Sequence, residues 1–222
     1  MFNKKLAIIG ASGAVGRVFI ELLDEMYPGT KDLFLVASKR SAGKSMLCGK
    51  EEFLIQDIED FDFSQVDIAF FSAGAETAEK YAPIAVSQGC TVIDNSSQFR
   101  TDSDKPLIVP EVNSRDLKDF KLPGIIANPN CSTAQLVVAL KPIHDLFKIE
   151  RVDVASYQSV SGTGKEGIDE LLEQTENFLN KKELHNIRQF ERKNLKNKKK
   201  LFIYLNYSGK DDIFNASKSL HK

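Results

Sequence analysis

Residues 5–26 read KLAIIGASGAVGRVFIELLDEM, in which an apolar run ends in a glycine-rich turn and an amphipathic segment follows. The run over residues 4–9 is typical of a buried strand. The apolar residues after the turn recur at helical spacing: Val15, Val18, Phe19, Leu22, Leu23 and Met26. Pro28 and Gly29 then predict the end of that helix. The stretch therefore predicts a strand–turn–helix unit of the kind that opens a nucleotide-binding fold.

The same alternation continues along the chain. Strands are predicted at 32–38, 66–74 and 90–97, with a helix over 75–89. Strands that alternate with helices predict a parallel sheet, whose ligands bind at the carboxyl ends of the strands. The fold class is therefore α/β, with a Rossmann-type nucleotide-binding domain over 1–127.

A second unit follows the first. A catalytic domain of α+β type is expected to open over 128–178, and its elements include a long strand at 150–160, a glycine turn and a helix. The opening is all that the sequence predicts of this domain, which we expect to be incomplete.

Composition places the chain among soluble globular proteins, with 42% hydrophobic and 27% charged residues in 222. No apolar stretch approaches the roughly 20 residues that span a bilayer, and the N-terminal apolar run stops at Gly10, which is short for a signal peptide. A cytoplasmic protein without a membrane partner is expected. The three cysteines form no CxxC pair, which argues against zinc, and their odd number without an export signal argues for reduced thiols.

The glycine-rich turn is the first candidate site. Its GxxGxxG pattern, between a strand and a helix, lets the backbone approach a pyrophosphate at the helix N-terminus. The alternative is a tight turn that binds nothing. The residues predicted to contact a cofactor here and at the end of the third strand are Gly10, Ser12, Gly13, Ala14, Val15, Gly16, Ser72, Ala73 and Gly74.

The end of the second strand indicates which cofactor is bound. NAD sites usually place an Asp or Glu there for the ribose hydroxyl, whereas NADP sites place a cation for the 2′-phosphate. The segment SKRSAGK, residues 38–44, has no acid. Arg40 can grip a phosphate with its guanidinium fork, and Ser38 and Ser41 can add hydroxyls. NADP is therefore predicted over NAD, and a solvated basic loop is the alternative.

Cys131 lies between the polar segment Asn-Pro-Asn and an apolar run of helical type. Asn130 is placed to cap that helix. The unpaired amides and the dipole at a helix N-terminus stabilise a thiolate, which is the reactive form of cysteine. A packed core thiol is the alternative, because a free cysteine is more often buried than reactive.

Five motifs over residues 1–178 carry a family resemblance, and they are GASGAVG, ASKRSAGK, DNSSQFR, ANPNCSTAQL and YQSVSGTGKEGIDEL. Together they resemble the bacterial type of aspartate-β-semialdehyde dehydrogenase. The related N-acetyl-γ-glutamyl-phosphate reductases do similar chemistry but typically carry a Gly-Cys-Tyr-Pro-Thr segment. The Asn-Cys-Ser-Thr of this chain points away from them.

The resemblance implies a reaction and partners. Aspartyl phosphate would acylate Cys131, and NADPH would reduce the thioester to aspartate semialdehyde with release of inorganic phosphate. In the reverse direction the aldehyde is oxidised and phosphorylated. The pathway implied is the biosynthesis of lysine, diaminopimelate, threonine and methionine. The family forms homodimers, largely through the catalytic domain.

The resemblance also implies roles for single residues. Gln158 corresponds to the residue that holds the substrate near the sulfur, and Arg100 to the arginine that binds its phosphate. Asn130, next to Cys131, is expected to be a catalytic residue together with it, and Ser161 and Gly162 form the loop that meets the nicotinamide. Without the motifs, Gln158 is a polar residue at a strand end and Arg100 a surface charge. The segment GTGKE is no Walker A loop, since Ser159 and Glu166 depart from that pattern.

The second half of the family pattern is missing. A base histidine in an Arg-x-Pro-Val…His segment, a Lys-Glu-Glu segment and a returning C-terminal helix are not found. Of the three histidines, His144 follows Cys131 by 13 positions, which is about 20 Å along one helix. His185 and His221 lie beyond the last motif. The sequence therefore predicts either an enzyme that lacks its base or a non-catalytic NADP-binding fragment.

Residues 179–222 differ in composition from the rest. They hold 12 basic and 4 acidic residues, and 30 of the 44 are Lys, Asn, Ile, Leu, Phe or Tyr. AT-rich codons encode these residues, so a frameshift in an AT-rich gene is our hypothesis for this basic tail. The rival is a tail that binds nucleic acid. It has neither a regular basic period nor a recognised motif, so no nucleic-acid partner is expected.

Overall fold

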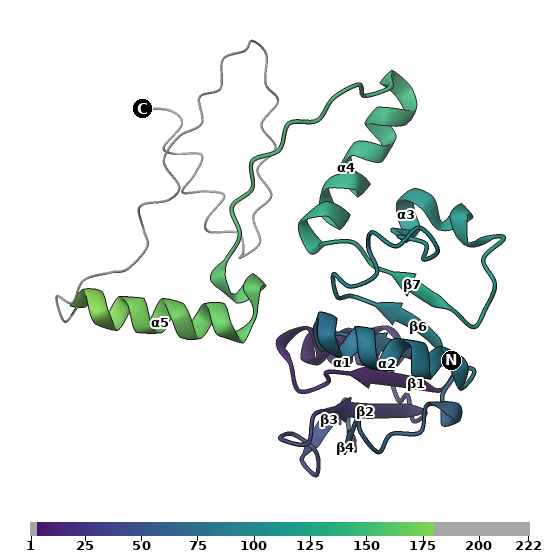
Figure 1. Ribbon diagram of the computed structural model, residues 1–222, viewed down its shortest axis with the longest axis vertical. Helices are drawn as coiled ribbons and strands as arrows, with labels where there is room; N and C mark the ends of the chain where they lie inside the picture. Colours follow the sequence, from purple (N-terminus) through teal and green to yellow (C-terminus); the bar gives the residue numbers. More distant parts are fainter. Residues whose placement is uncertain (1–3, 180–222) are drawn as a thin grey trace. The chain divides into compact units, whose positions relative to one another are not determined.

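The computed structural model describes residues 4–179, and the chain divides into two compact units, Met1–Lys141 and Pro142–Lys222. The first unit is built on a seven-stranded sheet with the order β3-β4-β2-β1-β5-β6-β7 (Figure 1). Its strands are β1 Leu6–Ile9, β2 Leu33–Ala37, β3 Ser45–Cys48, β4 Glu51–Asp57, β5 Ile68–Phe71, β6 Thr91–Asp94 and β7 Ile125–Ala127. All neighbouring strands are parallel except the β3–β4 hairpin, which confirms the predicted α/β class.

The connections of this sheet create a switch point between β1 and β5. The chain leaves β1 through helix α1 (Ala14–Met26) to β2 on one side, and it reaches β6 on the other side from β5 through α2 (Ala75–Ser87). At such a reversal of strand order the loops at the carboxyl ends diverge and leave a crevice for a ligand. The glycine-rich turn after β1 and the residues after β5 meet at this place.

Shorter elements complete the first unit. They are the 3-10 turns η1 Phe63–Gln65 and η2 Ser114–Leu117 and the short helix α3 Pro110–Asn113. The free side of β7 is covered by the segment before α3, where Ile108 donates its N–H to the carbonyl of Ala127 at 2.9 Å. Ala127 of β7 is therefore bonded on both sides of the strand.

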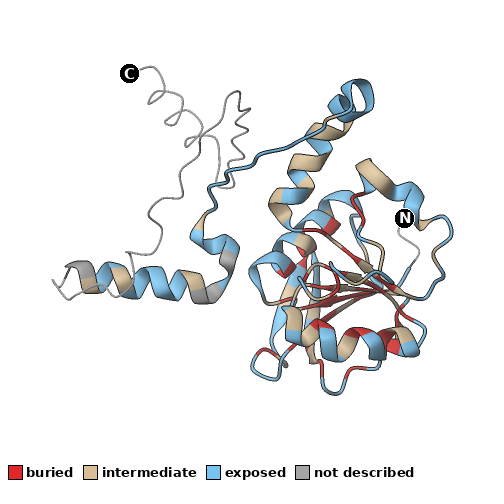
Figure 2. Ribbon diagram, turned by 45° about the horizontal axis from the view of Figure 1, so that its top comes forward, coloured by how far each residue is buried: buried red, intermediate tan, exposed pale blue. Residues whose placement is uncertain are grey.

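The core lies on both faces of the sheet, as a parallel sheet requires. One cluster joins Ala7 and Ile9 of β1 to the aromatic side chains of Phe63 and Phe71 and to the small residues of α2. The other joins the alternate residues of β1 to the buried side of α1. Figure 2 shows the buried positions concentrated in the strands, with exposed outer faces on the helices.

Helix α1 has more apolar residues than it buries against the sheet. Only Gly16, Ile20 and Leu23 are buried, although the pattern is apolar over much of the helix. The apolar residues that stay exposed are Val15, Val18, Leu22 and Met26. The helical period therefore predicted the helix correctly without showing which of its apolar residues reach the core.

The second unit contains the predicted turn and helix but not the predicted strand. The turn is η3, Val160–Thr163, and the helix is α5, Lys165–Leu179. The prediction of a strand at 150–160 is wrong: residues 148–159 have no regular structure. A strand must pair its backbone groups with a neighbour, and the second unit has no other strand among its described residues. Val152, Val154 and Tyr157 are accordingly exposed.

Helix α4, Cys131–Phe147, runs from the first unit into the second and confirms that Cys131 begins a helix. In the described residues, no helix is long and apolar enough to cross a membrane. The hypotheses on the basic tail, His185 and His221 concern residues 180–222, which lie outside the described part of the chain.

Candidate nucleotide and nucleophile site

The glycine-rich turn is closed so tightly that its glycines cannot carry side chains. Gly10 has a φ of +87°, and a Cβ on it would meet the carbonyl carbon of Ser72 at 2.9 Å. A Cβ on Gly16 would lie 2.4 Å from the carbonyl oxygen of Gly10 and 2.8 Å from the Cα of Ala11. These obstacles are backbone atoms, so the turn requires glycine at both positions.

The N-terminus of α1 suits an anion. Gly13 is its N-cap residue, no side chain caps the helix, and the first turn, which includes Ala14 and Val15, has no acidic residue. The first amides of a helix have no partner within it and carry a partial positive charge. The backbone at Gly13 to Gly16 therefore fits the pyrophosphate of a dinucleotide, the predicted cofactor class.

The predicted cofactor residues after β2 and β5 approach the same turn. The Ser12 hydroxyl donates to the hydroxyl of Ser41 at 3.0 Å, which links the glycine turn to the loop after β2. The Ser72 hydroxyl donates to the carbonyl of Ile9 at 3.0 Å. Three carboxyl ends of the sheet thus contribute to one site, as the topology requires.

The loop after β2 presents Arg40 to solvent. Ser41 is buried and its N–H closes a turn onto the carbonyl of Ser38 at 2.8 Å. Ser38 and Arg40 are exposed. The charged side chain therefore stands on a loop that Ser41 anchors, where it can fork onto a phosphate without first leaving another partner.

Around Cys131, the chain leaves β7 through Asn128, Pro129 and Asn130 and enters α4. The side-chain oxygen of Asn130 accepts the N–H of Ser132 at 3.0 Å and its hydroxyl at 2.6 Å. Asn130 therefore caps the helix as its position predicted. The Cys131 sulfur lies 3.8 Å from the same oxygen and is partly exposed, in contrast to a core thiol.

Arg100 lies beside this segment. Its Nε donates to the carbonyl of Asn128 at 2.9 Å, and its Nη2 donates to the carbonyl of Asn95 at 3.0 Å. Asn95 follows β6 and Asn128 follows β7, so the guanidinium bridges two adjacent strand ends. The alternative reading of Arg100 as a plain surface charge does not fit these contacts, because the side chain is partly buried and held at two points.

A buried carboxylate supports the same loop. Asp94 ends β6 with no exposed surface, and it accepts the N–H of Ser96 at 3.0 Å and its hydroxyl at 2.7 Å. Burial raises the pKa of Asp94 above its usual range, while these hydrogen bonds and the charge of Arg100 oppose that rise. Sequence reasoning missed Asp94, Asn95 and Asn128, although polar residues that directly follow apolar strand segments were a signal for them.

The remaining predicted residues lie in the second unit. A Cβ on Gly162 would come within 2.1 Å of the Nε2 of Gln158, so the amide of Gln158 lies over the turn η3. The hydroxyls of Ser159 and Ser161 are 2.7 Å apart in the same turn. The structure therefore brings Gln158, Ser161 and Gly162 together within their own unit, and Gln158 is exposed.

His144 cannot serve Cys131 as a base. Both lie on α4 and are 13 positions apart, which corresponds to about 20 Å along the helix axis. Proton transfer needs a direct contact of about 3 Å or one bridging water. Within residues 4–179 the structure also holds no group of three His, Cys, Asp or Glu side chains that could bind a metal.

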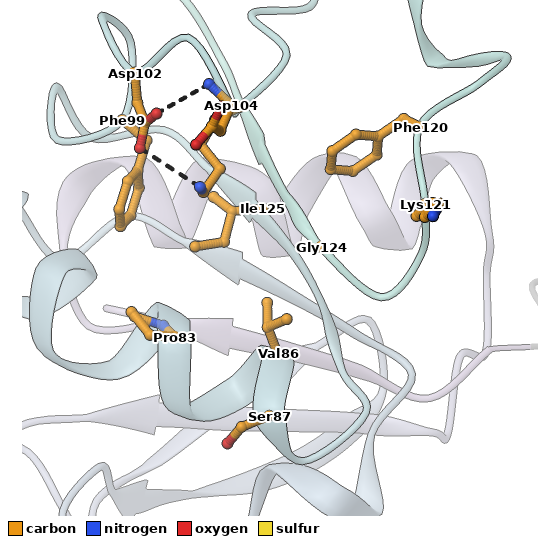
Figure 3. A pocket seen from close by; sticks show the side chains of 11 residues that line it. Pro83, Val86, Ser87, Phe99, Asp102, Asp104, Phe120, Lys121, Gly124 and Ile125 are labelled. Carbon is orange, nitrogen blue, oxygen red and sulfur yellow. Dashed lines mark hydrogen bonds and ion pairs between the residues drawn. The ribbon is translucent and has the colours of Figure 1, made fainter.

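A cavity of about 490 Å³ in the first unit is lined by other residues than the predicted site residues (Figure 3). Pro83, Val86 and Ile125 line it, and the ion pair of Lys105 and Asp102, at 3.5 Å, borders it. It opens at the C-terminal part of α2 and the first residue of β7, which is the amino edge of the sheet. The chemistry proposed for the carboxyl edge therefore does not use it.

The three thiols differ enough for a reactivity test. Burial, with a smaller contribution from the charge of Asp67, raises the pKa of Cys90 to about 12. Burial, with a smaller contribution from the charge of Asp24, also raises the pKa of Cys48. We expect iodoacetamide at pH 7.5 to label Cys131 at least about 10-fold faster than either, because only accessible thiolates react. Peptide mass spectrometry of timed samples measures this, and in denaturant the three rates should converge. Equal native rates, or a slowest Cys131, would show a packed thiol.

Two family models match the chain. The model described as "Semialdehyde dehydrogenase, NAD binding domain" matches residues 5–120, and that described as "Semialdehyde dehydrogenase, dimerisation domain" matches residues 140–201. The first match alone spans more than half of the 222 residues. The second match begins within α4 and extends past the described residues.

Several curated relatives are similar to the chain. Aspartate-semialdehyde dehydrogenase of Shewanella violacea is 54% identical over 174 residues, which is 78% of this chain and 52% of the relative. Aspartate-semialdehyde dehydrogenase 2 of Vibrio cholerae is 54% identical over 175 residues, which is 79% of this chain and 52% of the relative. The chain thus spans about half the length of these relatives.

Solved structures show the same fold. Aspartate semialdehyde dehydrogenase II of Vibrio cholerae, complexed with ASA, superimposes with a TM-score of 0.73 at 50% identity, covering 84% of this chain and 55% of that one. Aspartate semialdehyde dehydrogenase of Candida albicans, solved with NADP, has a TM-score of 0.56 at 31% identity and covers 72% of this chain and 52% of that one.

Proposed function

Because the chain belongs to the semialdehyde dehydrogenase family, we propose that it provides the cofactor site and the nucleophile for converting aspartyl phosphate to aspartate semialdehyde with NADPH. The observation that carries the proposal is the place of Cys131. Its partly exposed thiol begins α4 at the carboxyl edge of the sheet that also holds the glycine turn. Arg100, held beside the segment that leads to this cysteine, adds a cation for an anionic substrate.

Cys131 performs the first step. Its thiolate attacks the acyl carbon of aspartyl phosphate, a carbon–sulfur bond forms, and the bond from that carbon to the phosphate oxygen breaks. Cys131 begins α4, where the first amides of the helix favour a nearby negative charge. Arg100 offers its guanidinium to the departing phosphate, which a planar fork binds better than a single ammonium group. The products are a thioester on Cys131 and inorganic phosphate.

Reduction of the thioester completes the reaction. When bound, NADPH supplies a hydride to the acyl carbon. The hydride and one proton convert the thioester to a thiohemiacetal, whose carbon–sulfur bond then breaks to release the aldehyde and the Cys131 thiol. Asn130 holds the N-terminus of α4, and with it the sulfur, in place through its bonds to Ser132. Gln158 is proposed to orient the substrate, and Ser161 and Gly162 to meet the nicotinamide.

The wider setting follows from the proposed reaction. A free thiolate nucleophile needs a reducing compartment, which supports a cytoplasmic location. The match of residues 140–201 to a dimerisation domain supports a homodimer. The names of the relatives support a role in amino-acid biosynthesis, where aspartate semialdehyde leads toward lysine, diaminopimelate, threonine and methionine.

Cofactor choice gives a direct test of the first unit. We expect the full chain to bind NADP at least about 10-fold more tightly than NAD, because Arg40 can pair with the 2′-phosphate and no acid opposes it. Arg40→Ala should weaken the binding of NADP and leave the affinity for NAD unchanged. Calorimetric titration with both cofactors measures the gap, and Lys31→Ala serves as a control, since it removes an exposed cation before β2. Equal affinities of the unaltered chain for the two cofactors would remove the basis for an NADP site.

A second candidate function is a nucleotide-binding protein without turnover. The observation in its favour is that His144 lies about 20 Å along α4 from Cys131, too far to act as a base. Phosphate-dependent reduction of NADP with aspartate semialdehyde distinguishes the two functions. Activity that disappears with Cys131→Ala supports the enzyme, and cofactor binding with no Cys131-dependent turnover supports the binding protein.

A further inference from the structure

Arg100 is fixed by the backbone in a way that leaves one edge of its guanidinium open. Its Nε and one N–H of Nη2 are used by the carbonyls of Asn128 and Asn95, at 2.9 and 3.0 Å. An arginine has five N–H donors in a rigid plane, so three donors on Nη1 and Nη2 remain. These two nitrogens form a fork that matches two oxygens of a phosphate group.

The direction of that fork depends on where the two carbonyls lie. Asn128 donates its side-chain Nδ2 to the side-chain oxygen of Asn95 at 2.6 Å, which ties the end of β7 to the end of β6. The backbone of each residue is also bonded to the preceding strand end. The N–H of Asn128 donates to the carbonyl of Asp94 at 2.7 Å, and that of Asn95 to the carbonyl of Phe71 at 2.9 Å.

The side-chain bond is the part of this arrangement that depends on residue type. Any residue can supply the carbonyls, whereas only a side chain with a donor at 128 and an acceptor at 95 can lock their spacing. Both asparagines are partly buried, so the bond is shielded from competing water. Since Asn128 lies three positions before Cys131, the same bond sets the distance between the fork and the nucleophile segment.

We propose that Asn95 and Asn128 are positioning residues, which hold Arg100 so that its Nη1/Nη2 fork faces the phosphate group bound at the Cys131 site. The inference rests on the proposed function, because it assumes that an acyl phosphate or inorganic phosphate binds there. Neither asparagine touches the ligand; each acts through Arg100. Loss of their mutual bond lets the two carbonyls separate and the fork turn away.

Inorganic phosphate and the full chain are enough to test this. Phosphate bound beside Cys131 should slow the labelling of that cysteine by iodoacetamide, and the concentration for half protection gives an apparent Kd. We expect Asn128→Ala and Asn95→Ala each to raise this Kd about 10-fold, as expected for the loss of one charge-assisted contact. The double variant should be no worse than either single one, because both remove the same bond.

A double-mutant cycle separates positioning from a general structural effect. In the Arg100→Ala background, Asn128→Ala should cause no further loss of phosphate protection, since the group it positions is gone. Asn113→Ala is the matched control, because Asn113 also holds two backbone groups, the N–H of Val109 and the carbonyl of Leu107, in the neighbouring segment. It should leave the phosphate Kd unchanged. Thermal unfolding checks that each variant is folded. If Asn128→Ala does not fold, Asn95→Ala tests the same bond.

The outcomes distinguish the inference from the proposed function. If phosphate does not protect Cys131 even in the unaltered chain, the anion site of the proposed function fails and this inference fails with it. If Arg100→Ala weakens protection while the asparagine variants protect as well as the unaltered chain, only the inference is overturned. Further loss from Asn128→Ala in the Arg100→Ala background overturns it too, because Asn128 would then act independently of Arg100.

Discussion

Assayed alone, the 222-residue chain is expected to reduce NADP with aspartate semialdehyde and phosphate at a trace rate at most. The nucleophile is in place, but a base must take the proton of the thiol or the thiohemiacetal. Of three histidines in the sequence, His144 is about 20 Å from Cys131 along α4. Removing a general base typically costs about 10² to 10⁴ in rate.

Poor positioning adds to this loss. The chain covers about half the length of its relatives, and the expected Lys-Glu-Glu and Arg-x-Pro-Val segments are not found in it. Substrate groups without partners lose orientation, and orientation contributes several orders of magnitude to catalysis. Cofactor binding should survive, since the glycine turn and its sheet lie within the first unit.

Two measurements check the expected rate. A spectrophotometric assay of NADPH formation should give a rate close to that of Cys131→Ala, and the gene should not rescue a strain that requires diaminopimelate. Rescue at normal expression that is lost with Cys131→Ala would contradict the prediction. It would mean that His185, His221 or a partner chain supplies the base.

Gly16→Ala is expected to have the second large effect, a loss of NADP affinity of about 10²-fold. The new Cβ would overlap the carbonyl oxygen of Gly10 at 2.4 Å and the Cα of Ala11 at 2.8 Å. Because both atoms are backbone, the glycine turn must shift. We take the size of the affinity loss from catalysis, where misplacing a bound group by about 1 Å can lower the rate about 10²-fold. Overpacking at such a site also destabilises the fold by about 1–3 kcal/mol.

The direction of this effect is diagnostic. Gly16 lies inside α1, where alanine is favoured over glycine by about 1 kcal/mol on helix propensity alone. Destabilisation therefore reverses the sign that propensity predicts and reports the overlap. Gly89→Ala is the control: its Cβ meets nothing within 4 Å, its φ is +91°, and it lies after α2, away from the turn. It should lower the unfolding temperature and leave NADP binding unchanged in calorimetry. Normal NADP affinity in folded Gly16→Ala would mean that the turn does not bind the cofactor.

Strong local signals made much of the first unit predictable. Strands β1, β2, β5 and β6 and helices α1 and α2 fall within or near the predicted ranges, because each is a continuous apolar or helical pattern bounded by glycine or proline. The helix start at Cys131 was predictable from another local signal, since Asn130 is a strong capping residue.

The other strands could not be predicted, because their sequence patterns are weak or also occur in segments that form no strand. β7 has only three residues, too few for a periodic pattern, and the β3–β4 hairpin carries exposed Leu47 and Leu54 among charged residues. Conversely, residues 150–160 look like a strand, yet the described part of the second unit offers no strand to pair with them. Strand formation depends on a neighbouring strand, which is often distant in the sequence, and a single segment does not reveal that neighbour.

The sequence by itself determined the chemistry available at each position: glycines that permit a tight turn, a basic loop without an acid, and a cysteine behind a capping asparagine. These are local properties, fixed by side-chain size, charge and hydrogen-bonding groups within a few residues. Only the tertiary structure decided that Arg100 is held between Asn95 and Asn128, and that Ser12 meets Ser41 across 29 positions. Such contacts arise because parallel strands bring their carboxyl ends to one edge, and strand order is set by packing of the whole sheet rather than by any one segment.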